Sequence, residues 1–220
     1  MEKKEFHRHY LPHFQQPGQA YFVTWCLKDA VPTKALFSHT QKMELLKSQI
    51  RELGSAGLGH SEVEKLEIEY YDVQKKYLKA FDDLLDAERN PSVNLSKPDN
   101  TEIIMGSLKF WQGKKLNNCA FTVLCNHIHW VFETLEKDNE GNPVYLQDLL
   151  QSVKGFSAYQ INILEKRTGN LWQKESFDTT IRDDKHLYYA IKYTLNNPVA
   201  AGLVSDWKLW PGTWCRYDDF

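Results

Sequence analysis

Residues 118–133 read Asn118-Cys-Ala-Phe-Thr-Val-Leu-Cys-Asn-His-Ile-His-Trp-Val-Phe-Glu133, and this stretch decides the fold class. Two runs rich in aromatic, aliphatic and β-branched residues, 118–125 and 127–133, are separated by the single residue Asn126. Runs of this composition favour strands. So short a spacer allows only a tight antiparallel hairpin or one bent ribbon. We therefore expect an antiparallel β-unit in this part of the chain.

Further strands and helices are expected on both sides of this unit. The periodicity and capping signals predict strands at 20–27 and 171–182, and helices at 101–112, 146–167 and 183–196. The N-terminal 18 residues are expected to form an extended arm, and residues 206–220 an irregular tail. Strands mixed with helices in this order favour an α+β fold. The economical prediction is a ferredoxin-like antiparallel sheet with helices on one face.

Residues 39–89 are the clearest helical stretch. In its second half, apolar residues recur at alternating spacings of three and four, namely Val63, Leu66, Tyr70, Val73, Tyr77, Ala80 and Leu84. A glycine-rich segment at 54–59 separates the two halves, so a helical hairpin is expected. We predict one domain over 1–220 in which 39–98 is an inserted helical hairpin and loop. We recognise no candidate catalytic residue in this hairpin, and expect it to be dispensable for chemistry but not for stability or assembly.

Composition narrows the class of protein. The chain has 220 residues, 42% hydrophobic and 25% charged, as an ordinary soluble globular protein does. It has no apolar run long enough to span a membrane, and its charged start does not resemble a secretory signal. Four cysteines without a CxxC pair disfavour a disulfide framework or zinc knuckle and fit a reducing cytoplasm. The net charge of −2 neither supports nor excludes a nucleic-acid partner.

His127 and His129 are the first candidate site residues. Residues two apart on a strand point to the same face, so both imidazoles project together, while Ile128, Trp130 and Phe132 line the opposite face. Two adjacent imidazoles are half of a metal site. Two surface histidines can also have this spacing by chance, so the motif indicates a metal site only if further ligands lie nearby.

Tyr193 and Asn197 are the second candidate pair. They are four residues apart on a predicted helix, which places them about 40° apart around its axis and about 6 Å apart along it. In the alternative interpretation, Tyr193 lies in the core and Asn197 caps the helix before Pro198; position alone favours that alternative. Combined with the histidines, an amide oxygen would leave open positions on Mg²⁺ or Mn²⁺, beside a tyrosine that could attack a phosphodiester.

The segment Asn126-His-Ile-His-Trp130 resembles the His-hydrophobic-His strand of the HUH endonucleases. Among the HUH endonucleases, the chain is similar to the single-tyrosine transposases, especially the REP-associated tyrosine transposases. The other matching segments are the arm and first strand (9–13 and 18–25), a helix (151–156), the last strand (169–182) and the catalytic helix with its exit (192–203). The sequence departs from the family pattern, without losing a catalytic group, at Cys125, Trp130 and Thr179.

This resemblance implies a ferredoxin-like fold and a mechanism. Tyr193 would attack single-stranded DNA, leaving a 5′-phosphotyrosine link and a free 3′-OH. His127, His129 and Asn197 would bind the Mg²⁺ or Mn²⁺ ion. Further candidates for DNA contact, which also have ordinary roles as arm or surface residues, are Arg8, His9, His13, Lys154, Arg182 and Lys192.

The leading interpretation is a metal-dependent single-stranded DNA endonuclease and strand transferase, acting near DNA hairpins. It would work in the bacterial cytoplasm at the nucleoid, as a monomer or homodimer, without a membrane partner. One alternative is a catalytically silent protein that binds structured single-stranded DNA or RNA. Another is a metal-dependent hydrolase of small phosphoesters. The intact set of two histidines, tyrosine and asparagine favours the enzyme, whether Tyr193 serves its own chain or a partner.

Overall fold

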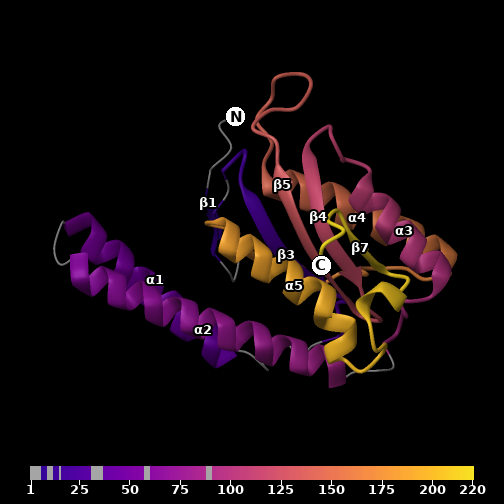
Figure 1. The fold of residues 1–220 in the computed structure, drawn as a ribbon, viewed down its shortest axis with the longest axis horizontal. Coiled ribbons are helices and arrows are strands. Elements are labelled where there is room, and N and C mark those ends of the chain that lie inside the picture. The colour runs from indigo at the N-terminus through magenta and orange to yellow at the C-terminus, as the bar shows by residue number, and fades with distance from the viewer. Residues whose placement is uncertain (1–5, 9–11, 15, 31–36, 57–59, 88–90) are drawn as a thin grey trace.

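A computed structural model describes residues 6–8, 12–14, 16–30, 37–56, 60–87 and 91–220. Its centre is a five-stranded sheet with the strand order β6-β3-β5-β4-β7, in which every neighbouring pair is antiparallel (Figure 1). The strands are β3 (Ala20–Cys26), β4 (Leu116–Val123), β5 (His127–Thr134), β6 (Phe177–Thr180) and β7 (Thr213–Cys215). The hairpin expected from 118–133 is β4–β5.

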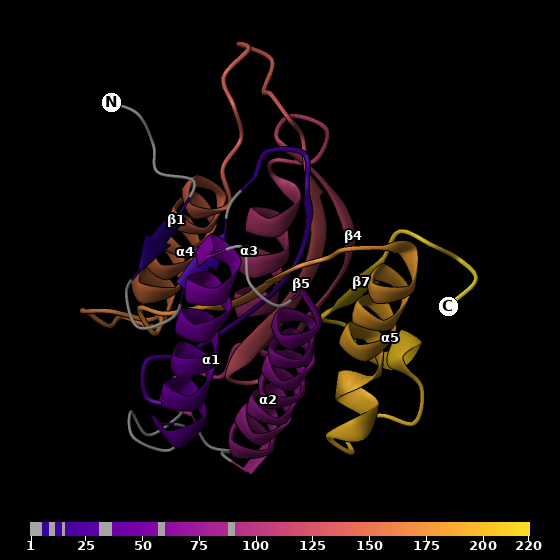
Figure 2. The ribbon, with the colours of Figure 1, turned by 90° about the vertical axis from the view of Figure 1, so that its left-hand side faces the viewer.

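The first four strands along this sheet have the ferredoxin-like connectivity. From β3 the chain passes through α3 (Pro98–Lys109) to β4, turns directly into β5, and passes through α4 (Leu146–Leu164) to β6. The two crossover helices α3 and α4 pack together on one face of the sheet (Figure 2). The predicted α+β class is confirmed.

The other face of the sheet also carries helices. Helix α5 (Asp184–Ala200) lies over β4 and β5, and the aromatic ring of Tyr193 reaches Phe22 on β3. Figure 2 shows α5 on the side of the sheet away from α3 and α4. Helices therefore flank both faces, where the sequence pattern predicted one. The two crossover helices α3 and α4 share one face, as predicted. Helix α5 lies on the other face, which was expected to carry no helix.

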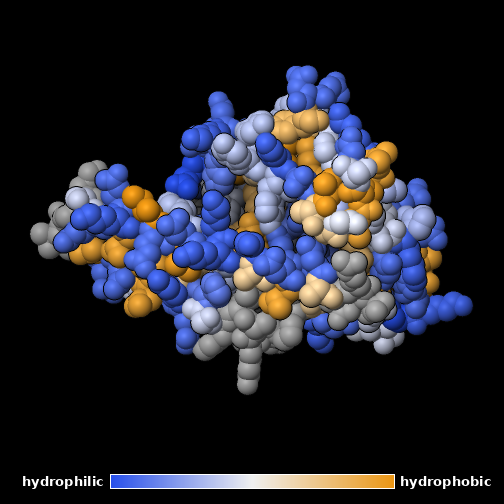
Figure 3. All heavy atoms as spheres, turned by 60° about the horizontal axis from the view of Figure 1, so that its bottom comes forward, coloured by the Kyte–Doolittle hydropathy of each residue, from blue (hydrophilic) through white to orange (hydrophobic). Residues whose placement is uncertain are grey.

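The predicted helical hairpin is present as α1 (Phe37–Ala56) and α2 (His60–Ala87), which pack along each other and extend outward from the sheet (Figure 1). The inner half of α2 buries its apolar seam at the sheet edge, where the rings of Tyr77 and Phe177 stack with centroids 5.5 Å apart. Its outer surface is mostly hydrophilic (Figure 3). No helix in the described part of the chain combines the length and apolarity needed to cross a membrane.

The segment expected to be an extended arm and the segment expected to be an irregular tail both contain short strands. Within the N-terminal arm, β1 (Phe6–Arg8) pairs with β2 (Pro12–Phe14). In the tail, a 3-10 helix (Trp207–Leu209) leads to β7, which adds to the sheet beside β4. There Trp214 stacks on Phe121 with ring centroids 5.4 Å apart. Strands of three residues are too short for an alternating pattern to be recognised in the sequence.

A buried polar side chain joins α3 to the sheet. Asn118 on β4 is 1% exposed, and its Oδ1 accepts a hydrogen bond of 2.6 Å from Nε1 of Trp130. Its Nδ2 donates to the carbonyl oxygen of Leu108 at 3.1 Å and to Oε1 of Gln112 at 3.0 Å. A buried amide with all its bonds made specifies how these elements meet.

Replacing this residue tests that role. Asn118→Ala leaves the buried indole N–H of Trp130 without its acceptor. Since each unsatisfied buried group costs about 1–3 kcal/mol, we expect the free energy of unfolding to fall by about 2–5 kcal/mol. Urea denaturation followed by circular dichroism measures it. The adjacent, less buried Asn117→Ala is the control, and equal losses in the two variants would contradict the assignment.

Candidate metal and nucleophile site

Strand β5 turns the two histidines toward the face covered by α2 and α5. The rings of His127 and His129 lie with centroids 4.9 Å apart, and both side chains are fully buried. Ile128 and Trp130, which alternate with them, are buried on the opposite face. The strand period thus places the imidazoles together, but inside the protein and not on a sheet surface.

Each imidazole is held through its Nδ1 atom. Nδ1 of His127 lies 2.7 Å from Oδ1 of Asn126, and Nδ1 of His129 lies 2.7 Å from Oγ1 of Thr24 on β3. Because an amide oxygen only accepts, the neutral His127 ring carries its proton on Nδ1. Its Nε2 lone pair is then available to a metal ion, and partners on the far ring nitrogen are the usual support of a metal-binding histidine.

Helix α2 brings a carboxylate to this pair. Oδ1 of the buried Asp82 lies 3.7 Å from Nε2 of His129, and donor atoms of Asp82, His127 and His129 all lie within 4.8 Å of one another. The expectation that the helical hairpin carries no candidate ligand is therefore wrong. One signal could have identified Asp82: Leu78, Asp82 and Leu85 recur at helical spacing, so an acid stands in a mostly apolar stripe.

Helix α5 adds an amide on the other side of His127. Asp183 caps the helix by accepting a 2.7 Å hydrogen bond from the backbone N–H of His186, and the helix continues through Pro198 to Ala200. Asn197 is therefore inside α5 rather than at its end. Its buried side chain interacts with the ring of His127.

Five buried atoms at this site have no hydrogen-bond partner among the described residues. They are Nε2 of His127, Nε2 of His129, both carboxylate oxygens of Asp82, and Oδ1 of Asn197. Buried polar atoms are nearly always paired, so a group of unpaired ones calls for an explanation. Two imidazole nitrogens, a carboxylate and an amide oxygen together form a donor set that suits a divalent cation. The residues present thus fit a metal ion.

Burial keeps the site without charge in the absence of a cation. It lowers the pKa of His127 to about 3, which the Asn197 side chain partly opposes. It also lowers the pKa of His129 well below its usual range, and His127 adds to that effect. Burial also raises the pKa of Asp82 to about 8, with Asp86 and Asp83 adding to the effect. Two neutral imidazoles are the form that binds metals.

The candidate nucleophile lies against the histidines of its own chain. The ring of Tyr193 meets the ring of His129 edge-on, with centroids 5.5 Å apart. One helical turn separates it from Asn197, as the sequence predicts. The neighbouring Tyr188 and Tyr189 are 47% and 56% exposed. A single chain therefore contains both the tyrosine and the imidazole pair.

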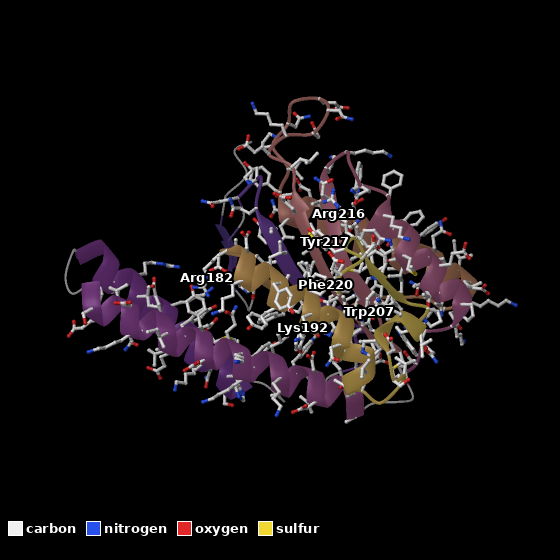
Figure 4. All side chains as sticks on the ribbon, viewed as in Figure 1. Arg182, Lys192, Trp207, Arg216, Tyr217 and Phe220 are labelled. Carbon is white, nitrogen blue, oxygen red and sulfur yellow. The ribbon has the colours of Figure 1, made fainter. Side chains whose placement is uncertain are left out.

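The structure separates the residues expected to contact DNA. Arg182 is exposed at the N-terminal end of α5, beside the helical hairpin, and Lys192 is exposed midway along α5 (Figure 4). Lys154 on α4 has a different environment: its ammonium donates to the carbonyl oxygens of 173 and 174 and to Ser176. The side chains of Arg8 and His13, in β1 and β2, and all of His9 lie outside the described residues.

Comparison with known proteins identifies a similar group. Over 96 residues the chain is 32% identical to a Haemophilus influenzae protein described as a "Putative REP-associated tyrosine transposase". The match covers 42% of this chain and 54% of that protein, so the chain spans about half the length of this relative. The resemblance expected from the motifs is confirmed by this similarity. No family model matches the chain.

A solved structure was also found, that of a REP-associated tyrosine transposase bound to a REP hairpin. It aligns with 96% of this chain and 82% of its own, with a TM-score of 0.44 and 16% sequence identity.

Metal binding by this site can be measured without activity. A ligand at 100 times its Kd stabilises a protein by about 2.7 kcal/mol, so Mn²⁺ should raise the melting temperature of the chain. Asp82→Asn removes the charged ligand, and we expect the Kd for Mn²⁺ to rise at least about tenfold. Calorimetric titration and thermal melts follow both effects.

The matched control is Asp83→Asn, one residue along α2 and exposed. It should bind Mn²⁺ as the unmodified chain does. An unchanged Mn²⁺ affinity in Asp82→Asn would exclude Asp82 as a ligand.

Proposed function

We propose that this chain, similar as it is to the REP-associated tyrosine transposases, is a metal-dependent enzyme that cuts and rejoins single-stranded DNA through Tyr193. The observation that carries the proposal is the ring of Tyr193, 5.5 Å from His129 at the edge of a buried group of unpaired metal-ligand atoms. A binding protein without chemistry has no use for such a group, whose burial costs stability.

Asp82, His127, His129 and Asn197 would hold the ion, Mg²⁺ or Mn²⁺. When bound, it supplies a Lewis acid that withdraws charge from a phosphate and favours the phenolate form of a tyrosine. The chain's own contribution is to keep the imidazoles neutral by burying them and to orient them through Asn126 and Thr24. It also excludes water, since all four ligand side chains are buried.

In the cutting step, the phenol oxygen of Tyr193 attacks phosphorus and the bond to the 3′-oxygen breaks. The phenol loses its proton to solvent, and the departing 3′-oxygen takes one up. The products are a 5′-phosphotyrosine link and a free 3′-OH. Attack by a 3′-OH reverses the step and rejoins a strand, so the chain that cuts can also transfer. An ordinary phenol is protonated at neutral pH, which is why a cation beside it matters.

The proposed substrate is a single strand next to a DNA hairpin. The solved structure with which this chain aligns is that of a transposase bound to a REP hairpin, and we extend that class of partner to this chain as part of the proposal. One chain suffices for cutting, because Tyr193 lies beside its own histidines. The alternative of a silent binder predicts DNA affinity without any covalent product.

Tyr193→Phe tests the proposal, because it keeps the ring and removes only the attacking oxygen. With labelled single-stranded oligonucleotides flanking a hairpin, and Mn²⁺ present, the covalent adduct should disappear on denaturing gels. Nicking should fall more than about 10³-fold, as for removal of a nucleophile.

Tyr188→Phe, on the same helix with its ring half exposed, should stay active. The Mn²⁺-induced rise in melting temperature should persist in both variants. An adduct formed by Tyr193→Phe at the normal rate would show that another group is the nucleophile.

A further inference from the structure

Two adjoining hollows lie between the helical hairpin and the edge of the sheet. The first, of about 530 Å³, is bounded by α1, α2 and β6; the second, of about 280 Å³, is bounded by α2, β6 and α5. They share Tyr71, Gln74, Thr179 and Arg182, and the second reaches Tyr193. We call the two together the hairpin groove. It leads from the outer part of the helical hairpin to the candidate nucleophile.

Cationic side chains predominate along the hairpin groove. Four of its lining residues are basic, namely Lys47, Arg51, Lys75 and Arg182, against two acidic ones, Glu67 and Asp178. The chain as a whole carries a net charge of −2, so this local excess runs against the overall balance. A groove with excess positive charge and a length of several side chains fits a polyanion.

Two of these cations lie against aromatic rings. The guanidinium of Arg182 lies 3.7 Å from the ring centre of Tyr71, and Nζ of Lys47 lies 4.9 Å from that of Tyr70. On the opposite wall, α5 contributes Tyr189, which is 56% exposed. Exposed rings offer faces on which unpaired bases stack, and cations between them meet the phosphates. Bases paired in a duplex have no face free for such stacking.

A hydrogen bond links two of the elements that line the hairpin groove, α2 and β6. Nε2 of Gln74 on α2 donates a 3.0 Å hydrogen bond to Oγ1 of Thr179 on β6. Further along α2, Asp82 lies at the metal site, so the same helix lines the groove and reaches the histidines. The position of the groove relative to Tyr193 is therefore built into the fold.

We propose that the hairpin groove binds the single strand of DNA that leads to the scissile phosphate. Its phosphates lie along Lys47, Arg51, Lys75 and Arg182, and its bases stack on Tyr71 and Tyr189. This inference rests on the proposed function, because the bound strand is taken to lead to the phosphate that Tyr193 attacks. In this proposal the helical hairpin helps to hold the substrate strand and also supplies Asp82 to the candidate metal site.

The test is equilibrium binding of a fluorescent single-stranded oligonucleotide to the full chain without added metal, followed by anisotropy over a range of salt concentrations. Arg182→Gln with Lys75→Gln should weaken binding and lower the salt slope, by about 0.7 for each phosphate that the protein no longer neutralises. Tyr189→Ala should weaken binding about 5- to 150-fold, as for removal of one base stack. Hairpin duplex DNA without a single-stranded flank should bind these variants and the unmodified chain equally.

The matched controls lie away from the hairpin groove. Lys109→Gln with Lys114→Gln removes the same two positive charges at exposed sites on either side of Phe110, and Tyr159→Ala makes the same truncation at an exposed ring on α4. Neither should alter single-strand binding. An unaltered Mn²⁺-induced rise in melting temperature shows that each groove variant is folded.

The outcomes separate the two proposals. Groove variants that bind single-stranded DNA as tightly as the controls would overturn the inference, even where Tyr193→Phe loses its adduct and the proposed function stands. Equal losses of affinity for single-stranded and duplex DNA would overturn it too, because the groove would then not select a single strand. Weakened single-strand binding alone supports it, even if Tyr193→Phe still forms an adduct and the proposed nucleophile fails.

Discussion

The burial of two imidazoles against a carboxyl group is the constraint on which the arrangement of this protein depends. His127, His129 and Asp82 lie within the core with unpaired donor atoms, and each such atom costs about 1–3 kcal/mol if nothing satisfies it. Three elements enclose these side chains: β5, which carries the histidines, α2, which carries Asp82, and α5, which packs against the histidine rings. A divalent cation bound there would satisfy all of these atoms at once, so the stability of the closed arrangement would depend on the proposed metal ion.

Helix α2 joins parts of the molecule that would otherwise be independent. It supplies Asp82 to the histidines, and the carbonyl oxygen of Leu85 accepts a 2.7 Å hydrogen bond from Asn126. Asn126 in turn holds the ring of His127. Toward its other end, α2 forms a wall of the hairpin groove. Helix α2 is thus linked to His127 through Asn126, and it lies along the proposed path of the substrate strand.

Helix α5 sets the distance between the candidate nucleophile and the candidate ligand Asn197 by its own regular geometry. Tyr193 and Asn197 are one turn apart, so a single rigid element places the phenol against His129 and the amide against His127. Proline at 198 does not end the helix, because the helix has only two further residues and loses little by the missing N–H. The amide is thereby kept in a regular, buried position rather than at a fraying end.

Local periodicity in the sequence determined which side chains share a face of their own element. The two-residue period of β5 places both imidazoles together and Trp130 opposite, the helical period pairs Tyr193 with Asn197, and the seam of 63–84 predicts the hairpin. Which faces then meet was decided only by tertiary structure. Asp82 stands among other acids on α2, and its approach to His129 depends on packing between residues 47 positions apart. The short strand β7 and the placement of α5 on the histidine face likewise arise from long-range contacts. A local pattern describes one element and carries no information about its partner.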